Sequence, residues 1–129
     1  MPESQPIIAI VDDEVSILWA LRRLLKSVGL TAATYTSAEE FLRSGLQQPI
    51  SCLVLDVQMP RMTGLELLAY LATSGVRLPV IVLTGLADEQ TRCRAERADV
   101  VAYLRKPVEA EALLEAIQRA LTRGSRTSL

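Results

Sequence analysis

Five side chains that could bind a ligand or react follow short apolar runs of the sequence. Asp12 and Asp13 come directly after the first run, Asp56 after the third, Thr84 after the fourth and Lys106 after the fifth. The chain holds only five Asp and two Lys, so this placement does not come from an acidic or lysine-rich composition. If these runs are parallel strands, their carboxyl ends meet at one edge of a sheet, where ligands of open α/β sheets bind.

Such a cluster suits a divalent cation and a phosphoryl group. Neighbouring carboxylates repel one another unless a cation neutralises them, and a small set of carboxylate oxygens favours Mg²⁺ over zinc. A lysine ammonium and a threonine hydroxyl can bind phosphoryl oxygens. Ser and Cys nucleophiles need a base, and the chain has no His. An ionised carboxylate can attack phosphorus directly, and Asp56 is the best-placed candidate, with an acyl phosphate as product.

Each residue also has an ordinary structural interpretation. An Asp after a strand often forms a turn or caps the next helix, which applies to Asp12 or Asp13 taken singly. Thr84 alone is typical of a strand, and Lys106 alone is typical of a solvated charge. The functional interpretation therefore depends on the combination of these residues.

The elements that would position these residues alternate strictly. Apolar runs without polar alternation indicate strands buried on both faces, and helical periodicity follows each run. Parallel strands need helical crossovers, so the pattern predicts an α/β fold of five βα units with helices on both faces of a parallel sheet. The predicted strands are Ile7 to Val11, Thr31 to Thr36, Cys52 to Leu55, Val80 to Leu83 and Val100 to Leu104, and the predicted helices span 14–28, 38–45, 64–73, 87–98 and 109–122.

Length and composition restrict the class of protein. The 129 residues fit one domain, which we place at 7–122 between flexible ends at 1–6 and 123–129. The net charge of −1 argues against direct binding of nucleic acid or an anionic membrane. Two cysteines without metal-type spacing, and the absence of a long apolar run, predict a cytoplasmic protein.

These motifs together resemble the receiver domain of two-component response regulators, from about Ile7 to Leu121. The resemblance is carried by the acidic pair, the block from Asp56 to Gly64, Thr84-Gly85 and the run from Tyr103 to Pro107. It implies a doubly wound, flavodoxin-like (βα)5 fold with strand order 2-1-3-4-5. It also implies a signalling switch rather than an enzyme acting on a separate substrate.

The resemblance assigns roles to the clustered residues. Asp56 would take a phosphoryl group from a histidine kinase or a histidine phosphotransfer protein. Mg²⁺ would be held by Asp13, Asp56 and the backbone carbonyl of Gln58, with Asp12 acting through water. Gln58 and Leu86 stand at positions that tune the lifetime of the phosphoryl group.

The same resemblance implies a switch. Thr84 and Lys106 would contact the phosphoryl oxygens, and Tyr103 would rotate inward as Thr84 moves, so that the face of helix 4, strand 5 and helix 5 changes. The ordinary alternative is that Tyr103 is a static, half-buried strand aromatic.

Three features depart from the family pattern. Asp99 stands where receivers usually carry a Gly, in a turn that Asp tolerates. The helix from Asp88 to Ala98 has few apolar side chains, so we expect it to be held weakly. Trp19 lies off the predicted core stripe of the first helix, Ile17, Leu21, Leu24 and Val28, and is either a packed surface residue or a docking residue for the kinase side.

Rival functions fit the residues less well. A haloacid-type phosphatase would need Asp at position 58, where Gln58 stands, and a flavodoxin-like redox protein would need a phosphate loop after the first strand. The alternative that stays open is a phosphorylation-independent, receiver-like interaction domain. The output would be a downstream protein partner or an effector domain missing from this chain, and we expect a monomer that dimerises, if at all, on activation.

Overall fold

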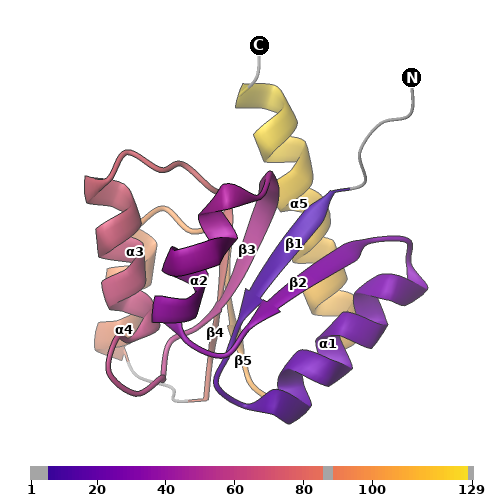
Figure 1. Cartoon of the computed structure of the whole chain (residues 1–129), viewed down its shortest axis with the longest axis horizontal. Coiled ribbons are helices and arrows are strands. Elements are labelled where there is room, and N and C mark those ends of the chain that lie inside the picture. Colours follow the sequence, from indigo (N-terminus) through magenta and orange to yellow (C-terminus); the bar gives the residue numbers. More distant parts are fainter. Residues whose placement is uncertain (1–5, 86–88, 128–129) are drawn as a thin grey trace.

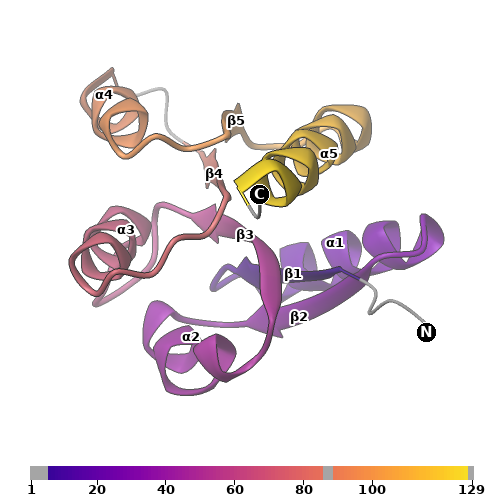
Figure 2. The ribbon, with the colours of Figure 1, turned by 90° about the horizontal axis from the view of Figure 1, so that it is seen from above.

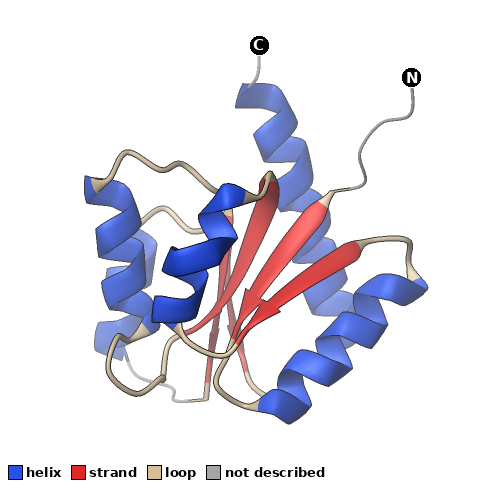
Figure 3. Cartoon of the chain, viewed as in Figure 1, coloured by secondary structure: helices blue, strands red, loops and turns tan. Residues whose placement is uncertain are grey.

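The computed structural model describes the backbone of residues 6–85 and 89–127 and the side chains of 6–85 and 89–123. Five parallel strands form one sheet in the order β2-β1-β3-β4-β5, which confirms the predicted topology (Figures 1 and 3). The predicted residue Leu86 and the predicted flexible residues 1–5 lie outside this description. The strands are β1 (Ile7–Val11), β2 (Thr31–Tyr35), β3 (Ile50–Asp56), β4 (Val80–Thr84) and β5 (Ala102–Arg105).

Helices cover both faces of the sheet. Figure 2 shows α1 and α5 on one side and α2, α3 and α4 on the other. Within the described ranges no helix is long and apolar enough to cross a lipid bilayer. The helices are α1 (Val15–Ser27), α2 (Ala38–Ser44), the short 3₁₀ helix η1 (Gly45–Gln47), α3 (Gly64–Thr73), α4 (Glu89–Arg97) and α5 (Ala110–Thr127).

Alternate residues of each strand supply two separate cores. Ala9 and Val11 of β1 pack with residues of α2 and α3, whereas Ile8 and Ile10 pack with residues of α1 and α5. Because side chains on a strand point to opposite faces in turn, a strand covered on both sides needs apolar residues at every position. This explains the continuous apolar runs of the sequence.

The predicted core stripe of α1 is wrong by one residue at several positions. Leu18, Leu21 and Leu25 are buried, whereas Val28 is 49% exposed. Ile17 and Leu24 are only partly buried and flank the core. Apolar residues stand at both sets of helical positions, so their spacing alone did not select the face that meets the sheet.

Other element boundaries also differ from the prediction, and β3 begins two residues earlier than expected, at Ile50. β5 begins at Ala102, two residues later than expected, because Asp99 adopts a left-handed conformation (φ 60°) and turns the chain before the strand. The positive φ confirms the turn predicted for Asp99. The helix α5 continues to Thr127, so residues 123–127 are helical rather than a separate tail. The proposed division of the chain into a domain and flexible ends otherwise stays a prediction.

The helix α4 is held by little buried surface. Of its nine residues only Ala95 is buried, and Cys93 is exposed. By contrast, the ten residues of α3 include five that are buried. The sparse apolar surface predicted for α4 is therefore present.

Candidate functional site

The end of β1 places one aspartate inside the protein and the next at its surface. Asp12 is fully buried, and its backbone N–H donates to the carbonyl of Tyr35 in β2 (3.1 Å). Its Oδ1 accepts a hydrogen bond from the backbone N–H of Glu14 (2.9 Å), at the start of α1. Asp13 is exposed. Consecutive residues thus present carboxylates in different environments.

Asp56 ends the central strand β3 and is only 1% exposed. Its Oδ1 accepts from the backbone N–H of Gln58 (3.4 Å). Gly64 packs directly against this strand end, where an added Cβ would lie 2.3 Å from the carbonyl oxygen of Asp56. The backbone N–H of Gly64 donates to the carbonyl of Val57 (2.9 Å), which fixes the return of the loop. Glycine is therefore required at position 64 for the close approach of α3 to the candidate nucleophile.

Lys106 links the acidic residues. Its Nζ lies 2.9 Å from Asp12 Oδ2, 3.2 Å from Asp56 Oδ1 and 3.1 Å from Glu14 Oε1. The backbone N–H of Lys106 donates to the carbonyl of Thr84 (2.8 Å), so the end of β4 positions the lysine. One ammonium therefore bridges the two buried carboxylates.

Burial and charge change the proton affinity of this cluster. The pKa of Asp56 is raised to about 6, mainly by burial and also by the nearby charge of Asp12, while Lys106 opposes the shift. Burial also raises the pKa of Asp12, against the hydrogen bond from Glu14 and the charge of Lys106. For Lys106, burial disfavours the charge, but hydrogen bonds to Asp12 and Glu14 outweigh it and raise the pKa. The lysine therefore stays charged, whereas ionisation of the two buried aspartates remains less favourable than in water.

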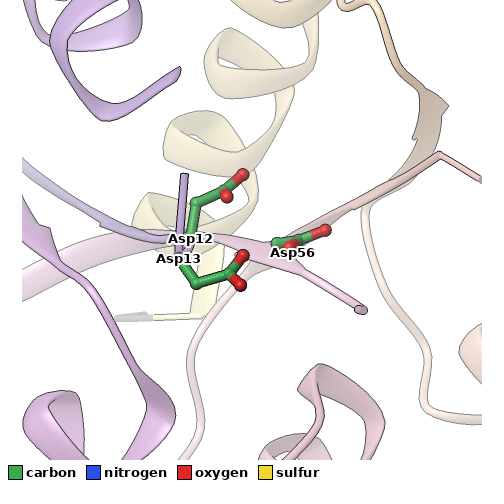
Figure 4. A group of neighbouring side chains, drawn as sticks. All are labelled: Asp12, Asp13 and Asp56. Carbon is green, nitrogen blue, oxygen red and sulfur yellow. The ribbon is translucent and has the colours of Figure 1, made fainter. Parts of the chain in front are cut away.

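Three carboxylates can meet at one cation. Asp12, Asp13 and Asp56 each offer an oxygen within 4.8 Å of the others, and Figure 4 shows the three side chains near one another. An all-oxygen donor set with one solvent-facing member matches the preference of Mg²⁺, which retains several waters. The residues present therefore fit a magnesium ion.

The Gln58 side chain connects two loops at the same edge. Its Nε2 donates to Thr84 Oγ1 (3.4 Å), and its Oε1 accepts from the backbone N–H of Gly85 (3.2 Å). Thr84 itself is fully buried. The amide thus spans from the loop after β3 to the end of β4.

Not every predicted residue lies in this cluster. Tyr103 pairs with Val82 in the register of β4 and β5 and is half-buried, so its switching role stays a prediction. Trp19 is 63% exposed on α1, on the face of the sheet opposite α3. Its exposure was predicted, and its docking role stays a prediction.

Sequence reasoning missed two contacts. Glu14, to which the sequence analysis assigned no role, is a third carboxylate on Lys106. The side chain of Gln58 bridges Thr84 and Gly85, whereas only its carbonyl and an effect on lifetime were predicted. No motif signals either contact, because both depend on how loops far apart in the sequence meet.

Comparisons with known proteins agree with this geometry. The family model of the response regulator receiver domain matches residues 8–118. The response regulator protein TmoT of Ectopseudomonas mendocina is 38% identical over 121 residues, 94% of this chain and 55% of TmoT. The transcriptional regulatory protein FixJ of Azorhizobium caulinodans is 37% identical over 125 residues, 97% of this chain and 59% of FixJ. The chain thus spans little more than half the length of these relatives.

Solved structures share the fold closely. The crystal structure of FixJ-N superposes with a TM-score of 0.84 at 34% identity, covering 93% of this chain and 96% of that one. The response regulator StyR superposes with a TM-score of 0.90 at 34% identity, covering 97% of this chain and 63% of StyR. The match extends over nearly the whole sheet and both helical layers. With the acidic edge and its lysine, it establishes that the chain belongs to the response regulator receiver domain family, whose members are signalling switches of two-component systems.

Proposed function

We propose that this chain is a phosphoacceptor, which takes a phosphoryl group onto Asp56 from a histidine kinase or a histidine phosphotransfer protein. The observation that carries the proposal is the position of Lys106, whose ammonium bridges the buried Asp12 and Asp56. A buried carboxylate depends on a neighbouring cation, rather than on water, to compensate its charge. Held in this way, Asp56 is positioned to attack phosphorus. Receiver domains interact with histidine kinases and with effector domains, which agrees with this role.

The transfer needs no base. An oxygen of Asp56 forms a new bond to phosphorus, the bond from phosphorus to the donor's imidazole nitrogen breaks, and its electron pair stays on that nitrogen. Lys106 is placed to neutralise charge on the phosphoryl oxygens, and Thr84 supplies a hydroxyl at the adjacent strand end. These residues position the group rather than exchange protons with it.

Asp13 and Asp56, with the backbone carbonyl of Gln58, would hold Mg²⁺, and Asp12 would bind it through water. When bound, the ion offsets the negative charge that accumulates as the phosphoryl group approaches. Burial is the main cause of the raised pKa values of Asp12 and Asp56, and a bound cation would favour the ionised form of both carboxylates.

Switching would begin at Thr84. A phosphoryl oxygen on Asp56 would accept from the Thr84 O–H and draw the hydroxyl away from Gln58 Nε2, which now donates to it at 3.4 Å, a long hydrogen bond. Movement of Thr84 would let Tyr103 turn inward and change the surface formed by α4, β5 and α5. The weak attachment of α4, with only Ala95 buried, supports a change at this surface.

Intact mass spectrometry tests the acceptor. The protein is incubated with acetyl phosphate and MgCl₂, and the mass gain of one phosphoryl group is expected for the native chain but not for Asp56→Asn. Removing the metal with EDTA should strongly reduce this mass gain. No gain with acetyl phosphate, together with no binding of beryllofluoride, would contradict the proposal and favour the phosphorylation-independent interaction domain.

Trp19 is proposed to dock the phosphodonor protein. Its exposed ring stands on α1 among Arg22, Arg23 and Lys26, and aromatic and arginine side chains anchor many interfaces. Trp19→Ala should slow transfer from the donor protein by about tenfold and leave phosphorylation by acetyl phosphate unchanged. Equal rates from the donor protein would show that Trp19 is only a surface residue.

A further inference from the structure

A groove of about 1100 Å³ lies between α3 and α4, away from the phosphoryl site. It is lined by the connection from α3 to β4, the first residue of β4, Val80, and the turn after α4 at Ala98 and Asp99. Strands begin at this edge, whereas Asp56 ends its strand at the opposite edge. Figure 2 shows α3 and α4 on the same face of the sheet.

The floor of the groove is apolar. Leu68 is buried, and Val76 and Leu78 are partly buried and pack against the core beneath α3. Ala72, also in the groove, is exposed on α3. An apolar floor that opens to solvent can bury side chains of a partner.

The walls carry positive charge. Arg77, Arg94, Arg97 and Arg123 line the groove, and Asp99 is the acidic residue among the described lining residues. Arg123 reaches from α5 to pair with Asp99 at 2.7 Å. Within residues 6–85 and 89–123, no ion pair is formed by Arg77, Arg94 or Arg97.

A matched residue on the same helix behaves differently. Arg92 does not line the groove and pairs with Glu96 one turn later, at 3.3 Å. On α4, the arginine that lies away from the groove thus has a carboxylate partner, whereas the arginines that line the groove have none among the described side chains. Their aliphatic stems can cover apolar surface, but that role leaves the charges without a counterpart.

We propose that this groove binds an acidic, partly apolar segment of a partner protein. Apolar side chains of the segment would lie on Leu68, Val76 and Leu78, and its carboxylates would pair with Arg94 and Arg97. Arginine suits this task because its planar guanidinium binds a carboxylate through two parallel hydrogen bonds. The apolar floor favours a protein segment over a nucleic acid backbone, which would leave that floor uncovered.

Fluorescence anisotropy tests the proposal without phosphorylation, so its outcome is independent of the function proposed for Asp56. The probe is a short fluorescein-labelled peptide of Leu and Glu at helical spacing, added to the unphosphorylated native chain. Binding is expected, and the same peptide with Lys in place of Glu should not bind. In ¹⁵N spectra, shifts should concentrate at Gly75, Val76 and Ala98 and spare the indole of Trp19.

Paired variants locate the interaction. Arg94→Glu with Arg97→Glu should weaken peptide binding by about tenfold or more, whereas Arg92→Glu should not change it. Ala72→Gln should obstruct the floor and weaken binding, whereas Ala20→Gln on the exposed side of α1 should not. All five positions are exposed, so circular dichroism should confirm folding in each case.

Three outcomes would overturn the proposal. The first is no binding of the acidic peptide by the native chain. The second is equal loss of affinity in the groove variants and their controls. The third is that a single-stranded RNA homopolymer binds at Arg94 and Arg97 more tightly than the peptide does. The groove would then be a site for phosphate groups.

Discussion

The two edges of the sheet treat charge in opposite ways. At the edge where strands end, Asp12 and Asp56 are almost fully buried, and both lie within 3.2 Å of the Lys106 ammonium. At the edge where strands begin, Arg94 and Arg97 are exposed beside an apolar groove. No carboxylate among the described side chains pairs with them.

The difference reflects the cost of burial. An ion removed from water must be compensated inside the chain, because an unpaired buried charge costs several kcal/mol. An exposed charge is stabilised by solvent until a partner arrives. The first edge is therefore built as a preorganised site for a small, highly charged group, and the second as a surface for a larger partner.

Removing Lys106 should have the largest effect of the changes predicted for the two edges. Lys106→Ala leaves Asp12 and Asp56 buried without their cation, and the rate of phosphorylation by acetyl phosphate should fall by about 10²- to 10³-fold. Stopped-flow fluorescence or timed intact mass measures the rate. Lys26→Ala, at the chain's other lysine, serves as the control and should keep the native rate. A loss of less than a few fold would show that the lysine is only structural.

A methyl group at position 64 should have the next largest effect. In Gly64→Ala the new Cβ would meet the backbone of Asp56 and Val57, neither of which can move without shifting β3. The free energy of unfolding should fall by about 3 kcal/mol in urea titrations. Gly75→Asn, where an added Cβ meets nothing within 4 Å, should cost much less despite its φ of 77°. Equal costs would show that close packing at Gly64 is unimportant.

The first edge was largely predictable from the sequence. Asp12, Asp13, Asp56 and Lys106 each follow an apolar run, and parallel strands bring such ends together whatever the details of packing. Strand order depended on the family resemblance, because periodicity alone does not order strands. The contact of Glu14 with Lys106 was not predictable, since it depends on the exact start of α1.

The second edge was not predictable. Arg77, Arg94 and Arg123 come from separate connections and helices, and no spacing in the sequence indicates that they line one groove. The buried face of α1 was predicted wrongly for a similar reason. Apolar residues occupy two overlapping stripes of the helix, and only packing against the sheet selects Leu18 and Leu25. Sequence patterns predict elements and their ends, whereas surfaces between elements depend on three-dimensional packing.

The buried charge of Asp56 should be measurable as a pH-dependent instability. Its pKa is raised from 3.8 to about 6 in the folded chain, so the folded state binds the proton more tightly than the unfolded state. The resulting penalty is absent below about pH 4, grows as pH rises and is complete above about pH 6. In EDTA, Asp56→Asn should therefore be more stable than the native chain at pH 8, by about 3 kcal/mol, and nearly equal at pH 4.

Urea titrations at the two pH values measure this difference. Magnesium chloride should narrow the difference in stability at pH 8, because a cation bound at the carboxylates stabilises the ionised form of Asp56 in the folded chain. A native chain more stable than Asp56→Asn at pH 8 would show that the ion pair with Lys106 outweighs burial.

The smallest expected effect concerns α4, which connects the two edges. One buried residue, Ala95, holds it to the sheet, whereas five buried residues hold α3, so local opening should be easier in α4. Hydrogen exchange should be at least about tenfold faster in α4 amides than in α3 amides. The acidic peptide should slow exchange in α4 without changing α1, because its binding pairs Arg94 and Arg97 and restrains the helix. Exchange in α4 as slow as in α3 would mean that the helix is held by more than its buried surface, and the contrast between a rigid edge and an adaptable one would not hold.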